Sequence, residues 1–319
     1  MATADQMKSL IRSHFSNDME RFCTVVLQVA AHEARQGHEA LANDLREIVK
    51  EERKKNGPRV ISFPRDLKGL VLTEEPSVPL SAMVLTDEIR TRLDRIVHEY
   101  RQQDKLKSHG LKHRRKILLI GPPGTGKTMT ARVLAKELRL SLHTIQVDRL
   151  VTKFMGETGA KLRQIFDLIQ EEHGVYLFDE FDAIGGDRSI DSDVGEMRRV
   201  LNAFLQFIEQ DTSDSLIIAA TNNPKLLDRA LFRRFDDVIY YEPPDADAIK
   251  QLIENILGNF LGTGFAWDKI ISACKGLSQA EIDIACLDAI KNAILYDCVM
   301  VNAEALLQNI KEKQEAHKK

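Results

Sequence analysis

The chain has 319 residues, which is enough for one large domain or for two to three small ones. Its apolar fraction of 43% is ordinary for a protein with a full buried core, and its net charge of −3 argues against a bulk nucleic-acid binder. Apolar runs reach only about five residues, against the roughly 20 that span a bilayer, and the N-terminus MATADQMKSL lacks a signal-sequence pattern. The four cysteines form no C-x-x-C pair, so we expect a soluble cytoplasmic protein with reduced thiols.

Residues 1–55 are predicted to form a small N-terminal helical bundle. Apolar residues recur with helical spacing in three places, and Gly37 interrupts the pattern before the third. The recurring residues are Met7, Leu10, Ile11 and Phe15, then Phe22, Val25, Val26 and Val29, then Leu41, Leu45, Ile48 and Val49. We interpret His14, His32 and His38 as structural or solvent-exposed residues rather than metal ligands. The bundle is expected to be a docking module for a substrate or partner, the alternative being a structural cap on the main domain.

Residues 56–84 are predicted to be a linker. The charged stretch Glu51–Lys55 runs into Asn56-Gly57-Pro58, and charge, glycine and proline together are typical of a connection between domains. Residues 59–81 carry three prolines between short apolar pieces, which favours an extended connection laid over the next domain.

The region 85–242 is predicted to open with a helix that starts at Thr86-Asp87-Glu88. Its buried stripe comprises Ile89, Leu93, Ile96, Val97 and Tyr100. The basic segment Lys112–Lys116 follows. Such a charge run is usually a solvated turn, which is the interpretation we favour, with a nucleic-acid patch as the alternative.

Strands and helices then alternate. The predicted strands are Ile117–Ile120, Leu142–Val147, Val175–Phe178, Leu216–Ala220 and Asp237–Tyr241. Alternation at this spacing predicts an α/β fold with a parallel sheet flanked by helices, in which ligands bind at the carboxyl ends of the strands.

A complete phosphate-binding pattern, G-x-x-x-x-G-K-[ST], follows the first of these strands and precedes a helix predicted for Lys127–Leu138. Its residues are Gly121, Pro122, Pro123, Gly124, Thr125, Gly126, Lys127 and Thr128, and we include Met129 among the binding residues. Glycines let the backbone approach phosphates closely, and the helix N-terminus adds positive potential. Lys127 is expected to reach the β- and γ-phosphates of ATP, and the Thr128 hydroxyl to ligate Mg²⁺.

Two carboxylates end the apolar strand that begins at Val175, about fifty residues after the phosphate loop. Asp179 is expected to hold Mg²⁺, directly or through water. Glu180 is placed to orient and polarise the attacking water. Alone, this pattern is weak, but together with a complete phosphate loop it strongly favours nucleotide hydrolysis.

From Pro243 onward the pattern is helical, and residues 243–319 are predicted to form a C-terminal helical lid. The expected helices are Asp247–Leu257, a segment near Trp267–Ala273, Ser278–Tyr296 and Ala303–His317.

Taken together, these stretches resemble the classical clade of AAA ATPases within the AAA+ superfamily, over roughly Leu85 to Val299. Ala219–Pro224 resembles the sensor-1 strand, with Asn222 at the position that reads the γ-phosphate and water. Leu227–Asp236 resembles the arginine-finger segment, which implies that Arg233 and Arg234 reach the neighbouring subunit's nucleotide. The segment is short, so the resemblance does not choose between them. Gly195–Asn202 and Gly276–Ile282 resemble the opening of the second region of homology and the lid signature near the base.

Lys153-Phe154-Met155-Gly156 resembles the family's pore loop, in which an aromatic ring grips an extended polypeptide. The alternative is a Phe that packs locally. Arg188–Gly195 is a weaker candidate for a second pore loop. The N-terminal bundle resembles that of small bacterial single-ring AAA proteins, some paired with a subtilisin-like protease and linked to phage defence.

The sequence therefore predicts an ATP-hydrolysing protein remodeller or unfoldase, with ATP and Mg²⁺ as cofactors and a homo-oligomeric ring, expected to be a hexamer. Its expected partners are a polypeptide substrate and a subtilisin-like protease, without a membrane and without nucleic acid. One alternative is a nucleotide-gated regulator or scaffold that controls a partner such as a serine protease. A DNA-associated motor is a third hypothesis, disfavoured by the acidic net charge.

Overall fold

The computed structural model describes residues 7–10, 13, 19–56, 67, 69–153, 157–184, 191–224, 229–262 and 264–316. It divides into two compact units, Met1–Pro64 and Arg65–Lys319. We describe each unit by itself.

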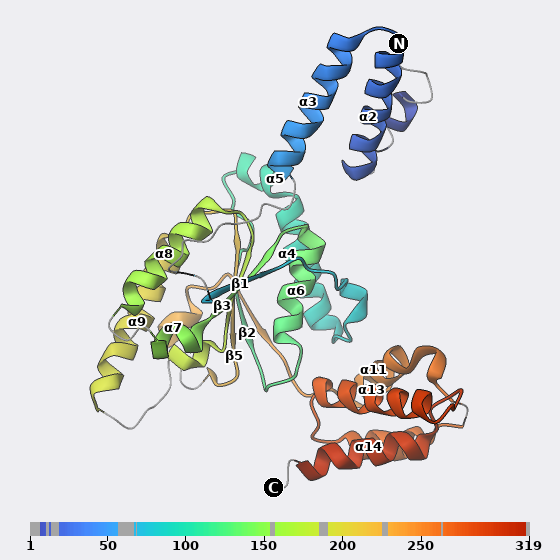
Figure 1. Cartoon of the computed structure of the whole chain (residues 1–319). Coiled ribbons are helices and arrows are strands. Elements are labelled where there is room, and N and C mark those ends of the chain that lie inside the picture. The colour runs from blue at the N-terminus through green and yellow to red at the C-terminus, as the bar shows by residue number, and fades with distance from the viewer. Residues whose placement is uncertain are drawn as a thin grey trace. The chain divides into compact units, whose positions relative to one another are not determined.

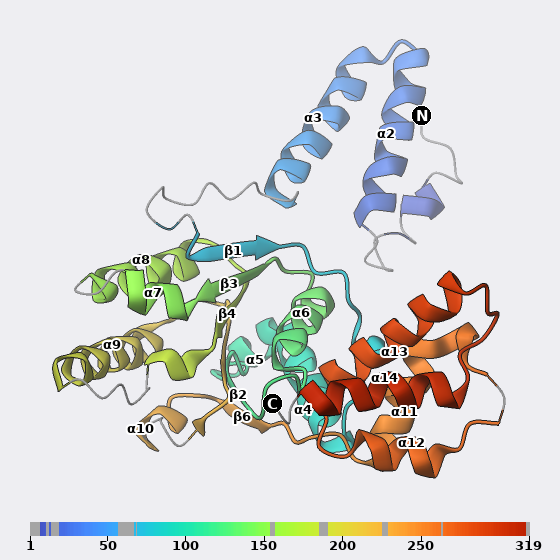
Figure 2. The same ribbon diagram turned by 60° about the horizontal axis from the view of Figure 1, so that its bottom comes forward.

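The first unit contains a helical hairpin of α2 (Met19–Arg35) and α3 (Glu39–Asn56) (Figures 1 and 2). Gly37 adopts a φ of +86° in the turn, a conformation that residues with a side chain rarely adopt. Beside it, His38 Nδ1 lies 2.7 Å from a carboxylate oxygen of the buried Glu33 and secures the turn. The predicted first helix is described only at residues 7–10 and 13, which are helical, and His14 lies outside the described residues.

The predicted apolar stripe of α3 is only partly buried. Val49 is buried, whereas 48% of Leu41 and 57% of Ile48 are exposed. The helical spacing was recognised correctly, but the hairpin uses only one side of the stripe, so two large apolar side chains remain at the surface.

The second unit is built on a six-stranded sheet with the order β1-β3-β4-β5-β2-β6. The strands are β1 (Val71–Glu74), β2 (Lys116–Ile120), β3 (Leu142–Gln146), β4 (Val175–Asp179), β5 (Leu216–Thr221) and β6 (Asp237–Tyr240). Strands β2 to β6 are parallel, as the sequence predicted, and β1 pairs antiparallel with β3.

The stretch that we expected to be a linker contributes to this sheet and to its surroundings. Within it, Val71–Glu74 forms the edge strand β1, and Leu80–Ala82 forms the short 3₁₀ helix η2. Strand β1 gave little signal because Val71 is its only fully buried residue and its partner strand lies about 70 positions away. The predicted extended conformation is correct for Val71–Glu74, but the prediction missed that this segment is a strand of the sheet and that a short helix follows it.

Helices cover both faces of the sheet (Figure 1). One face carries α4 (Asp87–Arg101) and α6 (Lys127–Leu138), with α5 (Gln103–Ser108) following α4. All five predicted stripe residues of α4 are buried, and Thr86 caps its N-terminus. The other face carries α7 (Val147–Lys153), α8 (Thr158–Glu171) and α9 (Asp191–Gln210). The 3₁₀ helix η3 (Phe181–Ile184) follows β4, and the one-turn helix α10 (Arg229–Phe232) precedes β6.

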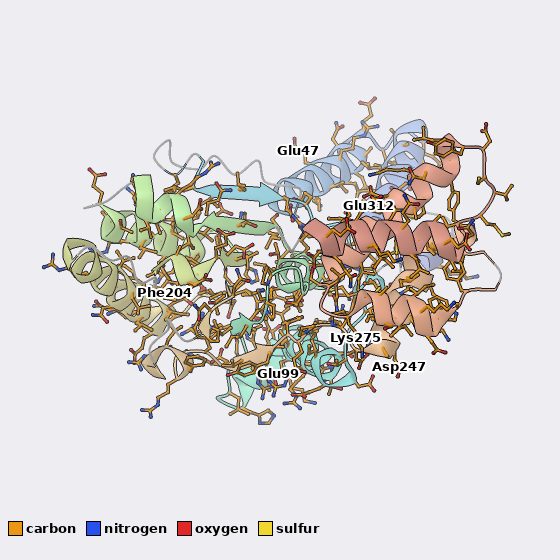
Figure 3. The ribbon with its side chains drawn as sticks, turned by 90° about the horizontal axis from the view of Figure 1, so that it is seen from below. Glu47, Glu99, Phe204, Asp247, Lys275 and Glu312 are labelled. Carbon is orange, nitrogen blue, oxygen red and sulfur yellow. The ribbon has the colours of Figure 1, made fainter. Side chains whose placement is uncertain are left out.

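An aromatic cluster fixes α8 and α9 on the sheet. Phe204 of α9, labelled in Figure 3, contacts Phe178 of β4 at 5.1 Å and Phe181 of η3 at 4.6 Å between ring centroids. Phe166 of α8 stacks on Phe178 at 5.9 Å. Because Phe178 and Phe181 flank Asp179 and Glu180, this packing holds the segment that carries both predicted catalytic carboxylates.

The C-terminal helices form a lid with its own core. They are α11 (Ala246–Leu257), α12 (Trp267–Cys274), α13 (Gln279–Leu295) and α14 (Ala303–Ala316), with the 3₁₀ helix η5 (Gly258–Phe260) after α11. Ser278 and Glu281 form a capping box that starts α13. The buried Cys274 and Cys286 belong to the lid core as free thiols, whereas Asp247, Lys275 and Glu312 lie on its outer surface (Figure 3). Within the described ranges, no helix is both long and apolar enough to cross a bilayer.

The basic segment before β2 is largely buried, so the predicted solvated turn was wrong. Arg115 is only 5% exposed and pairs with the fully buried carboxylate of Asp211. Arg114 pairs with Glu99, and His113 is also buried. The two arginines neutralise acidic groups of α4 and of the turn after α9, where β2 enters the core. Because Arg114 and Arg115 are paired with carboxylates, the structure also disfavours the alternative prediction that this segment forms a nucleic-acid-binding patch.

Replacing Asp211 by alanine is expected to lower the free energy of unfolding by about 3 to 5 kcal/mol, because it leaves the buried Arg115 guanidinium without its carboxylate. Urea unfolding of the full chain, followed by circular dichroism, measures this change. The matched control is Lys107→Ala, which breaks an ion pair with Asp214 whose side chains are 45% and 47% exposed. That control is expected to cost at most about 1 kcal/mol. Equal losses in the two variants would contradict a structural role for the buried pair.

Candidate active site

The turn between β2 and α6 is built for close backbone approach. Gly124 and Gly126 have φ values of +73° and +96°, in the left-handed region that favours glycine. Gly121 is restricted by space instead: a Cβ there would lie 2.4 Å from the carbonyl oxygen of Tyr241. The structure thus requires all three glycines of the predicted phosphate loop, two for their backbone conformation and one for lack of space.

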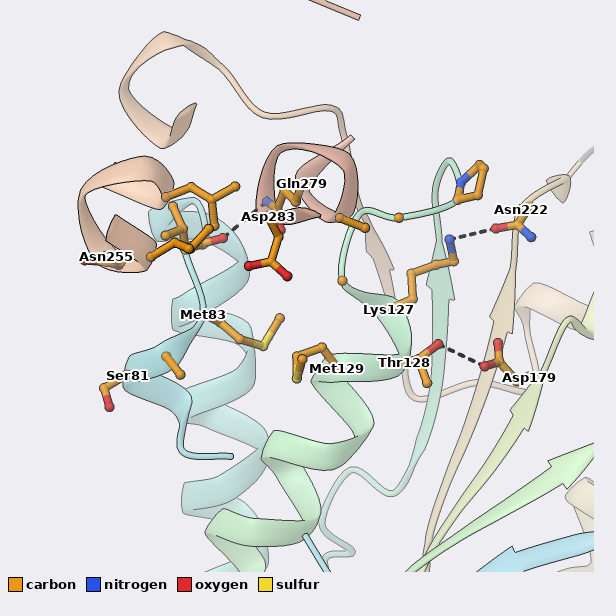
Figure 4. Close-up of a pocket in the computed structure, with 18 of the residues that line it drawn as sticks. Ser81, Met83, Lys127, Thr128, Met129, Asp179, Asn222, Asn255, Gln279 and Asp283 are labelled. Carbon is orange, nitrogen blue, oxygen red and sulfur yellow. Dashed lines mark hydrogen bonds between the residues drawn. The ribbon is translucent and has the colours of Figure 1, made fainter. Parts of the chain in front are cut away.

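Lys127, the first residue of α6, is 7% exposed and folds back over the turn. Its Nζ donates to the carbonyl oxygens of Gly121 at 2.7 Å and Pro122 at 2.8 Å, and to Asn222 Oδ1 at 2.8 Å (Figure 4). Burial lowers the pKa of Lys127, and the charges of Asp179 and Asp182 partly oppose that shift. The ammonium therefore lies where the ends of β2 and β5 meet, and it is directed at the predicted phosphate position.

Two oxygen-bearing side chains lie beside it. Thr128 Oγ1 donates to Asp179 Oδ2 at 2.9 Å, and the other Asp179 oxygen accepts from the Glu180 backbone N–H at 2.9 Å. Glu180 is exposed and has a φ of +52°, unusual for a residue with a side chain. Asp179 is still the last residue of β4, whereas this backbone conformation turns the chain at Glu180, so that the Glu180 carboxylate does not continue the alternation of the strand.

Asp182 is a functional candidate that sequence reasoning missed. One of its oxygens accepts from Thr221 Oγ1 and from the Asn222 backbone N–H, both at 3.1 Å. Asp182 therefore fixes the end of β5 and, through it, the side chain that contacts Lys127. The available signal was its place two residues after Glu180, but the spacing alone does not reveal a bond to a strand some forty residues away.

One cavity of about 730 Å³ in the second unit is lined by Lys127, Thr128, Asp179, Glu180 and Asn222 (Figure 4). Its walls also include Ser81–Val84, which follow η2, together with residues of α11 and α13. Met83 and Val84 come from the stretch that we predicted to be a linker, and Leu252, Asn255 and Ile256 from the first lid helix. None of these was selected from the sequence, because apolar and amide side chains in a helix or a connection carry no distinctive motif.

The predicted lid signature contacts the phosphate loop directly. The Ala280 backbone N–H donates to the Gly124 carbonyl at 3.1 Å, and Gln279 Nε2 donates to the Val84 carbonyl at 3.3 Å. A Cβ at Gly124 would lie 2.5 Å from Ser278 Oγ. The lid helix α13 thus begins against the loop, and its first turn closes one side of the cavity.

The remaining predicted site residues lie elsewhere. Phe154, Met155 and Gly156 fall outside the described residues, as do residues 188–190 of the candidate second pore loop. Residues 191–195 of that candidate are not a loop but the first residues of α9, and Lys153 ends α7. Arg233 is exposed, and Arg234 forms an ion pair with Glu209 at 3.3 Å. Neither arginine lines the cavity of its own chain. Their predicted role at a neighbouring subunit stays a prediction.

A parallel sheet with a glycine-rich loop after β2, a lysine at the helix start and a carboxylate at the end of β4, which β5 separates from β2, defines a P-loop nucleoside triphosphatase. Residues 117–243 match the family described as "ATPase family associated with various cellular activities (AAA)". An AAA family ATPase of Sinorhizobium fredii, y4kL, is 34% identical over 301 residues, covering 92% of this chain and 90% of the relative. This chain therefore belongs to the AAA family of ATPases and hydrolyses ATP.

Two further relatives cover the ATPase region. A 26S proteasome regulatory subunit homologue of Methanothermobacter thermautotrophicus is 33% identical over 205 residues, which are 63% of this chain and 55% of the relative. The ATP-dependent zinc metalloprotease FtsH 1 of Methylacidiphilum infernorum is 30% identical over 236 residues, 71% of this chain and 37% of the relative. These matches support a remodeller of the AAA type in a general sense.

Replacing Asp182 by alanine is expected to lower the turnover number for ATP on the order of 10²-fold, because the Asn222 side chain loses its fixed position. The Michaelis constant should change much less, since Asp182 makes no contact with the loop glycines. Steady-state ATPase assays separate the two quantities. Asp182→Asn keeps an oxygen that accepts both hydrogen bonds and should restore most of the turnover. Equal defects in the Ala and Asn variants would refute a positioning role.

Proposed function

We propose that the chain is an ATP-driven protein remodeller that works as a ring and threads polypeptide past the loop Lys153–Gly156. The observation that carries the proposal is the convergence of Lys127, Thr128, Asp179 and Asn222 on one cavity at the carboxyl ends of the strands. In an AAA ATPase this arrangement supports conversion of ATP energy into movement of the lid and of the loops.

Within the site, each side chain has a role that its position supports. Lys127 binds the β- and γ-phosphates, exchanging the carbonyl groups it now contacts for phosphate oxygens. Glu180, exposed at the cavity beside Asp179, orients and polarises the attacking water. Asn222 contacts the γ-phosphate and that water from the end of β5.

The oxygen atoms of Thr128 and Asp179 fit Mg²⁺, which prefers hard oxygen ligands and few protein side chains. Their separation of 2.9 Å places both beside the loop that would hold the phosphates. When bound, the ion supplies charge neutralisation to the β- and γ-phosphates.

The ring completes the site in this proposal. AAA ATPases generally form oligomeric rings, and we propose a hexamer in which Arg233 or Arg234 acts on the neighbouring subunit's ATP. Arg234 pairs with Glu209 of its own chain, whereas Arg233 is exposed. This difference favours Arg233 as the group free to reach a neighbour and Arg234 as its support.

A second candidate function is a nucleotide-gated regulator that controls a partner, such as a subtilisin-like protease, through the N-terminal unit. The observation in its favour is the exposure of Leu41 and Ile48, seven residues apart on one side of α3. This apolar pair also suits the docking role expected from the sequence. Under this alternative, Phe154 has no function in the work of the ring.

Replacing Glu180 by glutamine is expected to preserve ATP binding and to lower hydrolysis by at least about 10²-fold, because the amide cannot accept the proton of the attacking water. Binding is measured by calorimetry and turnover by phosphate release. Glu172→Gln, at a carboxyl group outside the cavity lining, serves as control. Near-normal turnover in Glu180→Gln would show that another residue activates the water.

Replacing Phe154 by alanine is expected to leave most ATPase activity intact and to abolish most unfolding of a protein substrate, because the loop loses the ring that grips the chain. The unfolding activity is measured as the loss of fluorescence of a fluorescent protein that carries an unstructured tag. Phe154→Tyr keeps the aromatic ring and is expected to keep activity. Unchanged unfolding by Phe154→Ala would remove the threading proposal and leave the regulator.

A further inference from the structure

A carboxylate of the lid faces the nucleotide cavity and has no assigned role. Asp283 lies on α13, one helical turn after Gln279 and on the same side of the helix. Its side chain projects into the cavity between Met83 and the phosphate loop (Figure 4). Gln279 is bound to the Val84 carbonyl, whereas within the described part of the chain the Asp283 carboxylate has neither a hydrogen bond nor an ion pair.

This part of the cavity is otherwise largely apolar. Met83, Val84, Met129, Leu252 and Ile256 line it, as suits the flat faces of a purine base and the carbon atoms of a ribose. A carboxyl group in such surroundings loses hydration, and burial accordingly raises the pKa of Asp283. Keeping the group there costs free energy unless a donor compensates it when the site is filled.

Asp283 lies apart from the groups expected at the phosphate end. Lys127 donates to Asn222 and Thr128 donates to Asp179, whereas Asp283 lies on the lid helix beside Met83 (Figure 4). The Asp283 carboxylate faces the nucleoside portion of a ligand whose phosphates are held at Gly124–Thr128.

We propose that Asp283 is a specificity residue of the nucleotide cavity, whose carboxylate accepts a hydrogen bond from an N–H or O–H donor on the nucleoside. In an adenine nucleotide the donor is either the 6-amino group of the base or a hydroxyl of the ribose, because only these groups of adenosine can donate. The inference rests on the nucleotide site described above and adds a direct contact between the lid and the nucleoside.

The test measures equilibrium binding to the full-length protein by calorimetry, with diphosphates so that hydrolysis does not interfere. The ligands are ADP, 2′-deoxy-ADP, 3′-deoxy-ADP and purine riboside 5′-diphosphate, which lacks the 6-amino group. The variants are Asp283→Ala and, as a matched control on the same helix, Asp288→Ala, whose aspartate pairs with Lys291 and Lys313 and does not line the cavity.

Loss of a hydrogen bond to a charged group is expected to weaken ADP binding to Asp283→Ala by about 10- to 100-fold. The one analogue that lacks the donor should bind the wild type and Asp283→Ala equally, and it identifies the base amine or the ribose hydroxyl. Asp288→Ala should bind all four ligands as the wild type does.

Three results would overturn the proposal: unchanged ADP affinity, tighter binding of every ligand, or an equal loss for all four ligands in Asp283→Ala. The second would mean that the carboxylate only repels the polyanion, and the third that the substitution disturbs the lid. The variant Lys127→Ala distinguishes failure of the Asp283 proposal from failure of the proposed nucleotide site. If that variant binds ADP as tightly as the wild type, the phosphate-loop assignment falls, whatever Asp283 does.

Discussion

Gly121 directly follows β2. The close approach of Tyr241, the residue after β6, leaves no room for a side chain at this position and restricts the loop that follows. The Tyr241 carbonyl and Cβ lie where a Gly121 side chain would have to go. Tyr241 OH also lies 2.5 Å from Thr130 Oγ1, which ties α6 to the end of β6. Because strand and helix are held this tightly, the loop between them has little freedom. Lys127 is thereby placed over the carbonyl groups at which the strand ends, before any ligand binds.

The charge around Lys127 supports the proposal that a neighbouring chain completes the catalytic site. The charges of Asp179 and Asp182 act on a single lysine, Glu180 lines the same cavity, and a triphosphate brings further negative charge. Neutralisation of that charge in a partly buried cavity requires additional cations. In the proposed ring, a metal at Thr128 and Asp179 would supply one, and an arginine from a neighbour would supply another. Arg233 and Arg234 do not line the cavity of their own chain, which agrees with the proposed ring.

The sequence predicted features that depend on local patterns and missed those that depend on contacts between distant segments. The phosphate loop, the five parallel strands and the buried stripe of α4 each have a pattern within a few residues. By contrast, β1 is defined by pairing with β3, and Asp182 by its bonds to Thr221 and Asn222. Arg115 was misread for the same reason, since a charge run indicates a solvated turn unless its buried partner, Asp211, is known.

The two sides of the cavity belong to separate hydrophobic cores. Leu134 and Ile117 belong to the core under the sheet, whereas Ile253 and Ile282 belong to the core of the lid. Direct bonds between the two sides are few, the Ala280 to Gly124 bond being one. A nucleotide held by Lys127 on one side and by Asp283 on the other would add contacts that neither core provides. Binding then stabilises one placement of the lid, and loss of the γ-phosphate changes only the Lys127 side. Separate cores joined by a ligand would allow hydrolysis to alter the position of the lid without unfolding either part.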